Sequence, residues 1–368
     1  MLLFVGISFA YFSPVLEGKR LDMPDIKNWK GMSKEVVDFR ETTGEEALWT
    51  NSMFSGMPAY QISTKYKANL IQYIDKALML GLPRPANMLF LYLLGFYILL
   101  LSLKVDYRLA VVGAIAFAFS SYFFIIIQAG HMTKAHAIAY MPMVVAAVLY
   151  TYRGKMFLGG VLTALTVALQ LYCNHLQITY YLILMLLLIG IVQLVKDIKA
   201  KNLVDFAKRS GILLFAGLLA SGTSLTRLST TMEYGKDSTR GKSELTDNLD
   251  NKTSGLDKDY ATSWSYGVAE TFTLLIPNFH GGASQGALTT DSETYQAIKR
   301  APNAKQLIKQ LPLYWGAQPF TSGPTYAGSI VIFLFVLGLL FVKAEMRIWL
   351  LLATILSIML AWGKNFMP

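Results

Sequence analysis

The feature that most constrains this fold is a series of apolar runs, several about 20 residues long, spread along a chain of 368 residues. A helix needs about 20 consecutive apolar residues to cross the hydrocarbon core of a bilayer. The composition agrees: 54% of the residues are hydrophobic and only 15% are charged, against about 25% charged residues in a typical soluble domain. The chain is therefore predicted to be an all-α polytopic membrane protein rather than a soluble protein with a very large core.

Hydropathy predicts about nine transmembrane helices and two long loops, 17–85 and 229–325. The first loop contains an amphipathic helix, predicted over 66–80, whose apolar residues form one stripe and suit it to the membrane surface. The alternative is a helix that packs on the core of the loop itself. The predicted spans are 1–16, 86–103, 109–127, 137–152, 157–173, 177–195, 210–228, 326–342 and 348–362.

The sequence at both ends of the chain is typical of a fragment of a longer protein. The first apolar run begins at Met1 without a basic flank, and the closing residues, AWGKNFMP, directly follow another apolar run. We expect more helices after residue 368, so that 1–368 forms a single transmembrane module with its C-terminal remainder missing.

Lys and Arg set the predicted orientation. If the N-terminus is cytoplasmic, both long loops lie outside, and the short outer segments hold only Lys134 and Lys364. This is the positive-inside pattern, and it explains the net charge of +10 without a nucleic-acid partner. The short inner connections hold Lys104, Arg108, Arg153, Lys155, Lys196, Lys199, Lys201, Lys208, Arg209, Lys343 and Arg347.

The sequence lacks the common motifs of soluble enzymes, namely G-x-G-x-x-G, the P-loop, H-E-x-x-H and C-x-x-C. Its one cysteine, Cys173, excludes an internal disulfide. Candidate chemistry therefore rests on polar groups in the predicted outer segments.

Asp22 and Asp25 come first, directly after the first span, where an aspartate can act as a general base or a metal ligand. The alternative is a solvated carboxylate at a helix end.

The other candidates lie in three further segments. His131, Lys134 and His136, in "AGHMTKAHA", suit a phosphate or pyrophosphate group, although their spacing argues against a zinc site built from them alone. The alternative is a Lys that snorkels to the interface beside two surface histidines. The polar residues of "NHLQ" have hydration of a helix end as their alternative role. The polar residues of the first loop have packing against the helices as theirs. These remaining candidates are Asn174, His175, Gln177, Arg40, Glu45, Glu46, Trp49 and Asn51, with Glu270 and His280 in the second loop.

Five stretches resemble the YfhO-type bacterial membrane proteins, in the version found in Bacteroidetes. They are "YFSPVLEGK", "DFRETTGEEALWTNSMFSGMPAYQIS", "AGHMTKAHAIAYMP", "NHLQITYY" and "AWGKNFMP", and the resemblance covers essentially the whole chain. It implies membership of the GT-C superfamily of membrane glycosyltransferases, a GT-C-like helical bundle, and a multi-pass protein of the bacterial inner (plasma) membrane. Family members use polyprenyl-phosphate-linked sugars on the extracytoplasmic face.

The resemblance also implies that Asp25, in the first-loop "D-I" motif, is the catalytic base or a metal partner. A lipid phosphate leaves readily as an anion, so one base and a cationic phosphate clamp suffice. Our hypothesis is inverting transfer from a polyprenyl-phosphate sugar to an envelope glycan or glycolipid, with Lys134, His131, His136 and Arg40 at the phosphate. No organic cofactor is expected; a divalent metal ion stays an open alternative. The residues expected to line the substrate pocket are Asn174, His175, Gln177, Glu46, Trp49, Asn51, Glu270 and His280.

Two other functions are compatible with the sequence. A transporter or flippase for a lipid-linked precursor would need ionisable groups near mid-membrane and paired broken helices, and the predicted spans carry few central charges. A non-catalytic assembly factor would keep the fold without the reaction. Sugar transfer from a labelled polyprenyl-phosphate sugar separates the first function from both of these.

Overall fold

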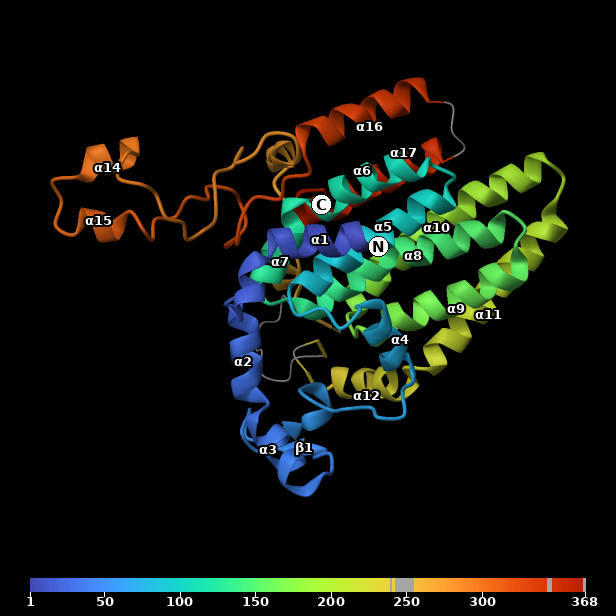
Figure 1. The fold of residues 1–368 in the computed structure, drawn as a ribbon, viewed down its shortest axis with the longest axis horizontal. Helices are drawn as coiled ribbons and strands as arrows, with labels where there is room; N and C mark the ends of the chain where they lie inside the picture. Colours follow the sequence, from blue (N-terminus) through green and yellow to red (C-terminus); the bar gives the residue numbers. More distant parts are fainter. Residues whose placement is uncertain (239, 242–254, 343–345, 367–368) are drawn as a thin grey trace. The chain divides into compact units, whose positions relative to one another are not determined.

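The computed structural model is mostly helical and describes residues 1–238, 240–241, 255–342 and 346–366 (Figure 1). The chain forms two compact units. Unit 1 contains Met1–Phe119 and Ile126–Ser238, and unit 2 contains Ser120–Ile125 and Thr239–Pro368. Part of the predicted second loop, 239 and 242–254, and part of the predicted inner connection, 343–345, lie outside the described residues.

Helix α8 forms the centre of unit 1. It packs against α5 and α9, while α11 packs against α9, and α5 also contacts α1 and α6. The buried side chains of unit 1 concentrate in α8 and in the first half of α5. The helices are α1 (Leu2–Tyr11), α5 (Ala86–Ser102), α6 (Tyr107–Ala118), α8 (Met132–Tyr152), α9 (Met156–Tyr172), α10 (Leu176–Lys199), α11 (Leu203–Gly222) and α12 (Leu225–Gly235).

Glycines allow these helices to approach one another closely. A Cβ added at Gly95 of α5 would lie 2.6 Å from the carbonyl oxygen of Ala139 in α8. A Cβ at Gly160 of α9 would lie 2.6 Å from Cγ2 of Ile212 in α11. Small residues at helix contacts are typical of bundles in membranes, where packing rather than the hydrophobic effect holds helices together.

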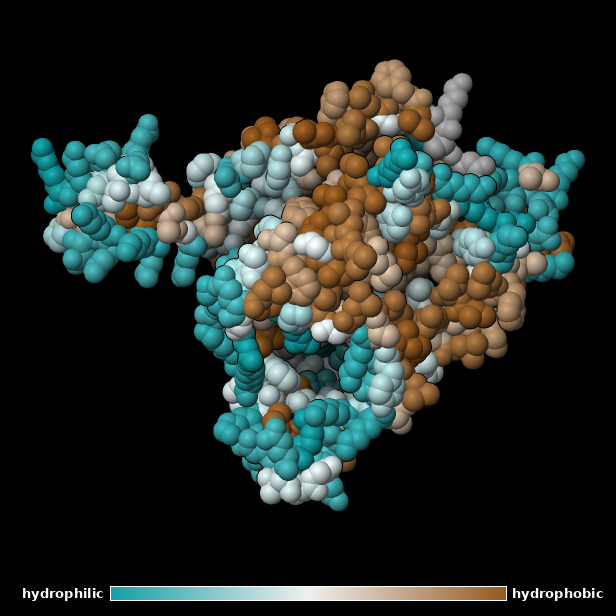
Figure 2. Space-filling model, in the orientation of Figure 1, coloured by the Kyte–Doolittle hydropathy of each residue, from teal (hydrophilic) through white to brown (hydrophobic). Residues whose placement is uncertain are grey.

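Much of the apolar helix surface of unit 1 is not covered by protein. Only 17% of the most apolar window of α10 is buried, and Phe215 and Leu218 of α11 are 62% and 73% exposed. Figure 2 shows hydrophobic atoms over α1 and over the α9–α11 side of unit 1, and hydrophilic atoms over the end formed by the first loop. Apolar surface of this extent requires a nonaqueous neighbour, which agrees with a membrane protein.

Among the described residues, three helices are long and apolar enough to cross a membrane, α8, α10 and Arg347–Asn365. A fourth span results if α6 and α7 (Ser121–Ala129), which are bent by 48°, count as one. Four further helices are apolar but shorter: α1, α5, α9 and α16 (Ser329–Phe341). The expectation of nine spans stays a prediction.

Several predicted spans have different boundaries in the structure. The span predicted over 109–127 is interrupted because the backbone N–H of Ser121 donates to Tyr326 O instead of continuing the helix. The span predicted over 210–228 ends at Gly222. There the Thr223 hydroxyl donates to Ala220 O at 2.7 Å, a local bond that competes with the helical pattern, and α12 starts two residues later.

The first long loop is folded, as predicted, but its amphipathic helix α4 (Ile71–Leu78) is shorter than the predicted 66–80. It starts late because the side chain of Asn69 accepts the N–H of Ile71, and it ends before Leu80 and Gly81, which both have positive φ. The other elements of the loop are a 3-10 helix (Ser13–Glu17), α2 (Pro24–Met32), α3 (Lys34–Thr43), the antiparallel strands β1 (Trp49–Thr50) and β2 (Met57–Pro58), and a second 3-10 helix (Ala59–Gln61).

Unit 2 combines short loop helices with two apolar helices. Isolated bridges join Gly281 to Tyr314 and Gly286 to Leu311, so the loop that follows residue 255 folds back on itself. Its elements are α13 (Lys258–Ala261), a 3-10 helix (Ala269–Leu274), α14 (Glu293–Ile298), α15 (Ala304–Leu307), α16, α17 (Arg347–Trp362) and a 3-10 helix (Gly363–Asn365).

Candidate functional site

Asp25 lies in the first turn of α2, next to Pro24 at the start of the helix. Proline suits this position because its ring fixes φ and no N–H is needed there. The Asp25 side chain is about half exposed, and its Oδ2 lies 2.9 Å from Nε2 of His131. Asp22 has a different partner, since its Oδ1 lies 2.6 Å from Nζ of Lys27 at the exposed surface. Asp22 and Asp25, the two candidate aspartates, therefore have separate environments.

Gly130 brings the turn between α7 and α8 against the first turn of α2. It has a φ of +94°, and an added Cβ would lie 3.1 Å from Cβ of Asp25 and from the backbone nitrogen of Ile26. No larger residue fits this approach without a shift, and L-residues rarely adopt this φ. The contact places His131, the next residue, beside Asp25 even though more than a hundred positions separate them in sequence.

The surroundings of His131 favour its neutral form. Burial lowers its pKa below the ordinary 6.5 of histidine, the positive charge of Lys134 lowers the pKa further, and the Asp25 carboxylate opposes both effects. Lys134 is half-buried in the first turn of α8. A neutral imidazole that donates its Nε2–H to Asp25 would orient the carboxylate and stabilise its charge. The arrangement thus joins an acid, an imidazole and a nearby ammonium group.

His136 does not join this group. Its Nε2 lies 2.7 Å from Oδ1 of Asp75 in α4, and the hydroxyl of Tyr140 donates to the same oxygen at 2.6 Å. Asp75 is only 4% exposed. Asp75 is not among the site residues predicted from the sequence. The available signal was the pair His136 and Tyr140, which lie four residues apart on one face of an apolar helix and need a polar partner.

The "NHLQ" segment forms the turn between α9 and α10. Asn174 has a positive φ, His175 precedes the first residue of α10, and Nε2 of Gln177 donates to the hydroxyl of Tyr181 at 2.9 Å. Because α8 and α9 pack together and are joined by a short turn, the end of α9 returns to the end where α8 begins. Candidate groups of both turns therefore lie at one end of the bundle.

The first-loop candidates mainly hold the loop together. Arg40 is 9% exposed; its Nε donates to Oε2 of Glu46 at 2.9 Å and its Nη2 donates to Ser63 O at 2.5 Å. Burial of Glu46 acts against ionisation, but the hydrogen bond and charge of Arg40 outweigh it and lower the pKa of Glu46. The indole N–H of Trp49 donates to Asn51 within the same hairpin. These contacts suit a structural role.

Another carboxylate of this loop, Glu35, is not among the residues predicted from the sequence. Glu35 accepts a hydrogen bond from the hydroxyl of Thr50 and from the backbone N–H groups of Asn51 and Ser52. The bond from Thr50 is the largest cause of the lowered pKa of Glu35. Glu35 therefore fixes the strand β1 to α3.

Glu270 and His280 belong to unit 2, which is described by itself. Glu270 is 4% exposed and accepts the hydroxyl of Tyr314 at 2.9 Å. Burial, with the Glu270 contact, raises the pKa of Tyr314 to about 12. His280 packs edge-on against Phe279. Glu270 thus has a local hydrogen-bond partner, whereas neither ring nitrogen of His280 has one among the described residues.

Within the described residues, no three His, Cys, Asp or Glu side chains gather in a way that could hold a metal ion.

No family model, curated protein or solved structure matches the chain. The resemblance to the YfhO-type proteins therefore stays a prediction, and the site must be judged by its geometry.

Proposed function

We propose that the chain is a glycosyltransferase of the GT-C type, which transfers a sugar from a polyprenyl-phosphate donor to a hydroxyl of an envelope glycan or glycolipid. The observation that carries the proposal is the 2.9 Å contact between Asp25 and His131. This contact joins the first loop to the turn before α8. Lys134 lies in the first turn of α8, three residues after His131. The charge of Asp25 acts on Lys134, and a base and a cation in its vicinity are the two groups that this reaction needs.

In the proposed reaction, Asp25 accepts the proton of the acceptor hydroxyl while the hydroxyl oxygen attacks the anomeric carbon of the donor. The bond between that carbon and the phosphate oxygen breaks, and the electron pair leaves with the lipid phosphate. The configuration at the anomeric carbon inverts, because attack comes from the opposite face. The ammonium group of Lys134 would stabilise the leaving phosphate, and His131 would hold the carboxylate in place.

The distribution of polar groups supports an interfacial site. The turns that carry His131 and His175 lie at one end of α8, α9 and α10, whereas the turns with Arg153, Lys155 and Lys201 lie at the other end. In a bilayer, the basic end would face the cytoplasm and the end with Asp25 would face outward. Nine spans, with a cytoplasmic N-terminus in a bacterial inner membrane, belong to this proposal.

The polar end of unit 1 suits an interfacial substrate. Figure 2 shows hydrophilic atoms over α2 and α4, the helices that contain Asp25 and Asp75. A polyprenyl tail has to remain in lipid while its phosphate reaches water, so the polar end of an apolar bundle suits such a substrate.

The test is transfer of a labelled sugar from a polyprenyl-phosphate donor by the full chain in liposomes. Asp25→Asn should abolish formation of the new glycosidic bond. Asp22→Asn is the matched control, because Asp22 lies three residues away and pairs only with exposed Lys27. Equal transfer by both variants would remove Asp25 as the base. Movement of the labelled lipid across the bilayer without bond formation would favour the flippase instead.

A further inference from the structure

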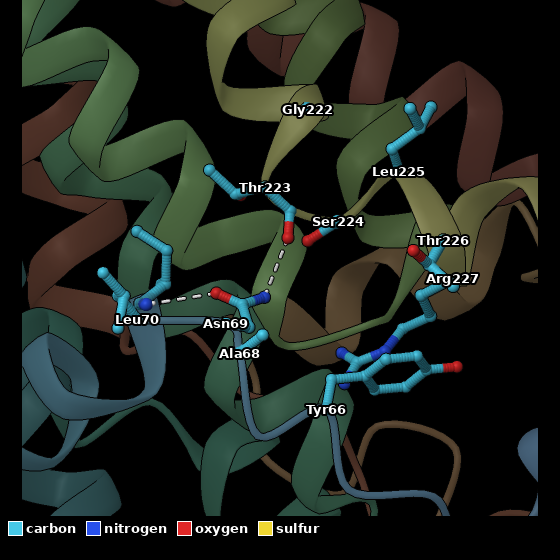
Figure 3. Close-up of a pocket in the computed structure, with 11 residues that line it drawn as sticks. Tyr66, Ala68, Asn69, Leu70, Gly222, Thr223, Ser224, Leu225, Thr226 and Arg227 are labelled. Atoms are coloured by element: carbon cyan, nitrogen blue, oxygen red, sulfur yellow. Dashed lines mark hydrogen bonds between the residues drawn. The ribbon is translucent and has the colours of Figure 1, made fainter.

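A pocket of about 400 Å³ lies in unit 1 between the segment before α4 and the junction of α11 with α12 (Figure 3). Its lining comes from 66–71 on one side and 222–227 on the other. Asn69 joins the two sides, since its Nδ2 donates to Thr223 O at 2.9 Å while its Oδ1 accepts the N–H of Ile71. The pocket is therefore formed by fixed backbone segments from distant parts of the chain.

Arg227 supplies a cation to this pocket. Its guanidinium group lies over the ring of Tyr66 at 4.8 Å from the ring centre, as Figure 3 shows, and Nη1 donates to Tyr172 O at 2.7 Å. No carboxylate among the described residues forms an ion pair with it. A guanidinium has five N–H donors, so stacking and one carbonyl leave donors for a ligand.

Ser224 supplies a second, independent indication of a ligand. It lines the pocket and is 5% exposed, and within the described chain its hydroxyl has no hydrogen-bond partner. A buried hydroxyl without a partner is unfavourable unless something outside the chain satisfies it. Figure 3 draws its oxygen on the side of the junction that faces Asn69.

The start of α12 adds a third favourable element. Ser224 occupies the N-cap position, yet its side chain does not cap the helix. The first N–H groups of an α-helix have no acceptor within the helix, and together with the helix dipole they favour an anion. The helix is eleven residues long, which is long enough for this effect to be appreciable.

We infer that the pocket at Arg227 and Ser224 binds a phosphate group. The guanidinium would bind the oxyanion through charge-assisted hydrogen bonds, and the Ser224 hydroxyl and the first N–H groups of α12 would complete the set of donors. Leu70, Ile71 and Leu225 place apolar surface beside these donors, so the pocket suits a phosphate ester as well as free phosphate. The inference does not depend on the proposed glycosyltransferase, because no residue of the pocket belongs to the Asp25 site.

The test uses the full chain, purified in a non-ionic detergent without phosphate. Isothermal titration with inorganic phosphate tests the free anion, and native mass spectrometry after addition of phosphatidic acid tests a lipid head group. Ser224→Ala should weaken binding about tenfold, the usual effect of one hydrogen bond to a charged group, without lowering the melting temperature. Arg227→Gln should weaken binding further. Lys236→Gln removes an exposed charge beyond the other end of α12 and serves as the control.

Each outcome decides the inference. Binding of inorganic phosphate that falls in the Ser224 and Arg227 variants but not in the Lys236 variant supports a site for a free phosphate or a phosphate ester. Adducts with phosphatidic acid alone, with the same dependence on the variants, support a lipid head group. Binding of neither probe, or equal binding by the wild type and all variants, would overturn the inference. Because Ser224→Ala deletes only a hydroxyl that has no partner among the described residues, a folding defect in the Arg227 variant would not leave the question open.

Discussion

The hydroxyl of Tyr140 in α8 donates a hydrogen bond of 2.6 Å to Oδ1 of Asp75 in α4. Nε2 of His136 lies 2.7 Å from the same oxygen. A carboxylate that is 4% exposed thus fastens the amphipathic helix of the first loop to the central helix of unit 1. The loop that carries Asp25 and the helix that follows His131 are joined at this second point.

Tyr140→Phe should therefore destabilise unit 1 without changing its shape. The substitution removes one donor from a buried carboxylate, at a cost of about 1.5–3 kcal/mol. Thermal unfolding in detergent measures the effect. Tyr150→Phe is the matched control, since Tyr150 is half-buried in the same helix and should cost less than about 0.5 kcal/mol. An equal loss in both variants would contradict the role of the Asp75 contact.

Gly130→Ala should separate the turn before α8 from α2. Gly130 has a φ of +94° and contacts Asp25, whereas Gly154 has a φ of +90° with nothing within 4 Å of an added Cβ. Both variants suffer backbone strain of about 1–3 kcal/mol, so the difference between them reports the contact with Asp25. We expect sugar transfer to fall at least tenfold in Gly130→Ala and to persist in Gly154→Ala. If both variants retain full transfer, the closeness of His131 to Asp25 is not needed.

The stability of the protein should fall with decreasing pH in a way that depends on His131. Its pKa in the folded state lies below 6.5, chiefly through burial and also through the charge of Lys134. Below 6.5 the unfolded chain therefore takes up a proton that the folded chain does not, and stability declines until the pH reaches the lower folded pKa. Melting temperature against pH should be flatter over this interval for His131→Gln. A steeper decline in the variant would contradict the sign of the shift.

Arg40→Met should unfold the first loop at lower denaturant concentration than the wild type. The change leaves the carboxylate of Glu46, whose side chain is 18% exposed, without its cation. Loss of one partner of a buried ion pair costs about 3–5 kcal/mol. Lys34→Met is the control, because its ion pair with Asp38 is exposed and such pairs contribute little to stability. Limited proteolysis measures how well the first loop is protected from cleavage in both variants. Equal protection would show that Arg40 does not hold the loop.

The proposed orientation can be measured with single cysteines. Cys173 is the single cysteine of the sequence. A Cys173→Ser background therefore leaves no competing thiol. Gln177→Cys, at the start of α10, should react with a membrane-impermeant maleimide added outside intact cells. Lys155→Cys, in the turn between α8 and α9, should react only after the membrane is opened. Labelling of both positions from the same side would exclude α9 as a membrane span.

The helical class and most helix positions could be predicted from sequence because they depend on local information. A run of apolar residues such as Ala86–Ser102 or Met156–Tyr172 has few alternatives to a helix, and the structure has helices within one residue of the ranges 86–103 and 157–173. The interruptions were not predicted. The break before Ser121 depends on a bond to Tyr326, two hundred residues away, and no local pattern reports such a partner.

The candidate site divides in the same way. The sequence by itself determined which polar groups leave the apolar runs, and it pointed to Asp25, His131 and Lys134 by their residue types and positions. Only the tertiary structure decided that Asp25 pairs with His131 while His136 pairs with Asp75. It also created the pocket of Arg227 and Ser224 from two distant segments. Hydropathy is a property of each short segment, whereas a pairing depends on which helix ends the packing brings together.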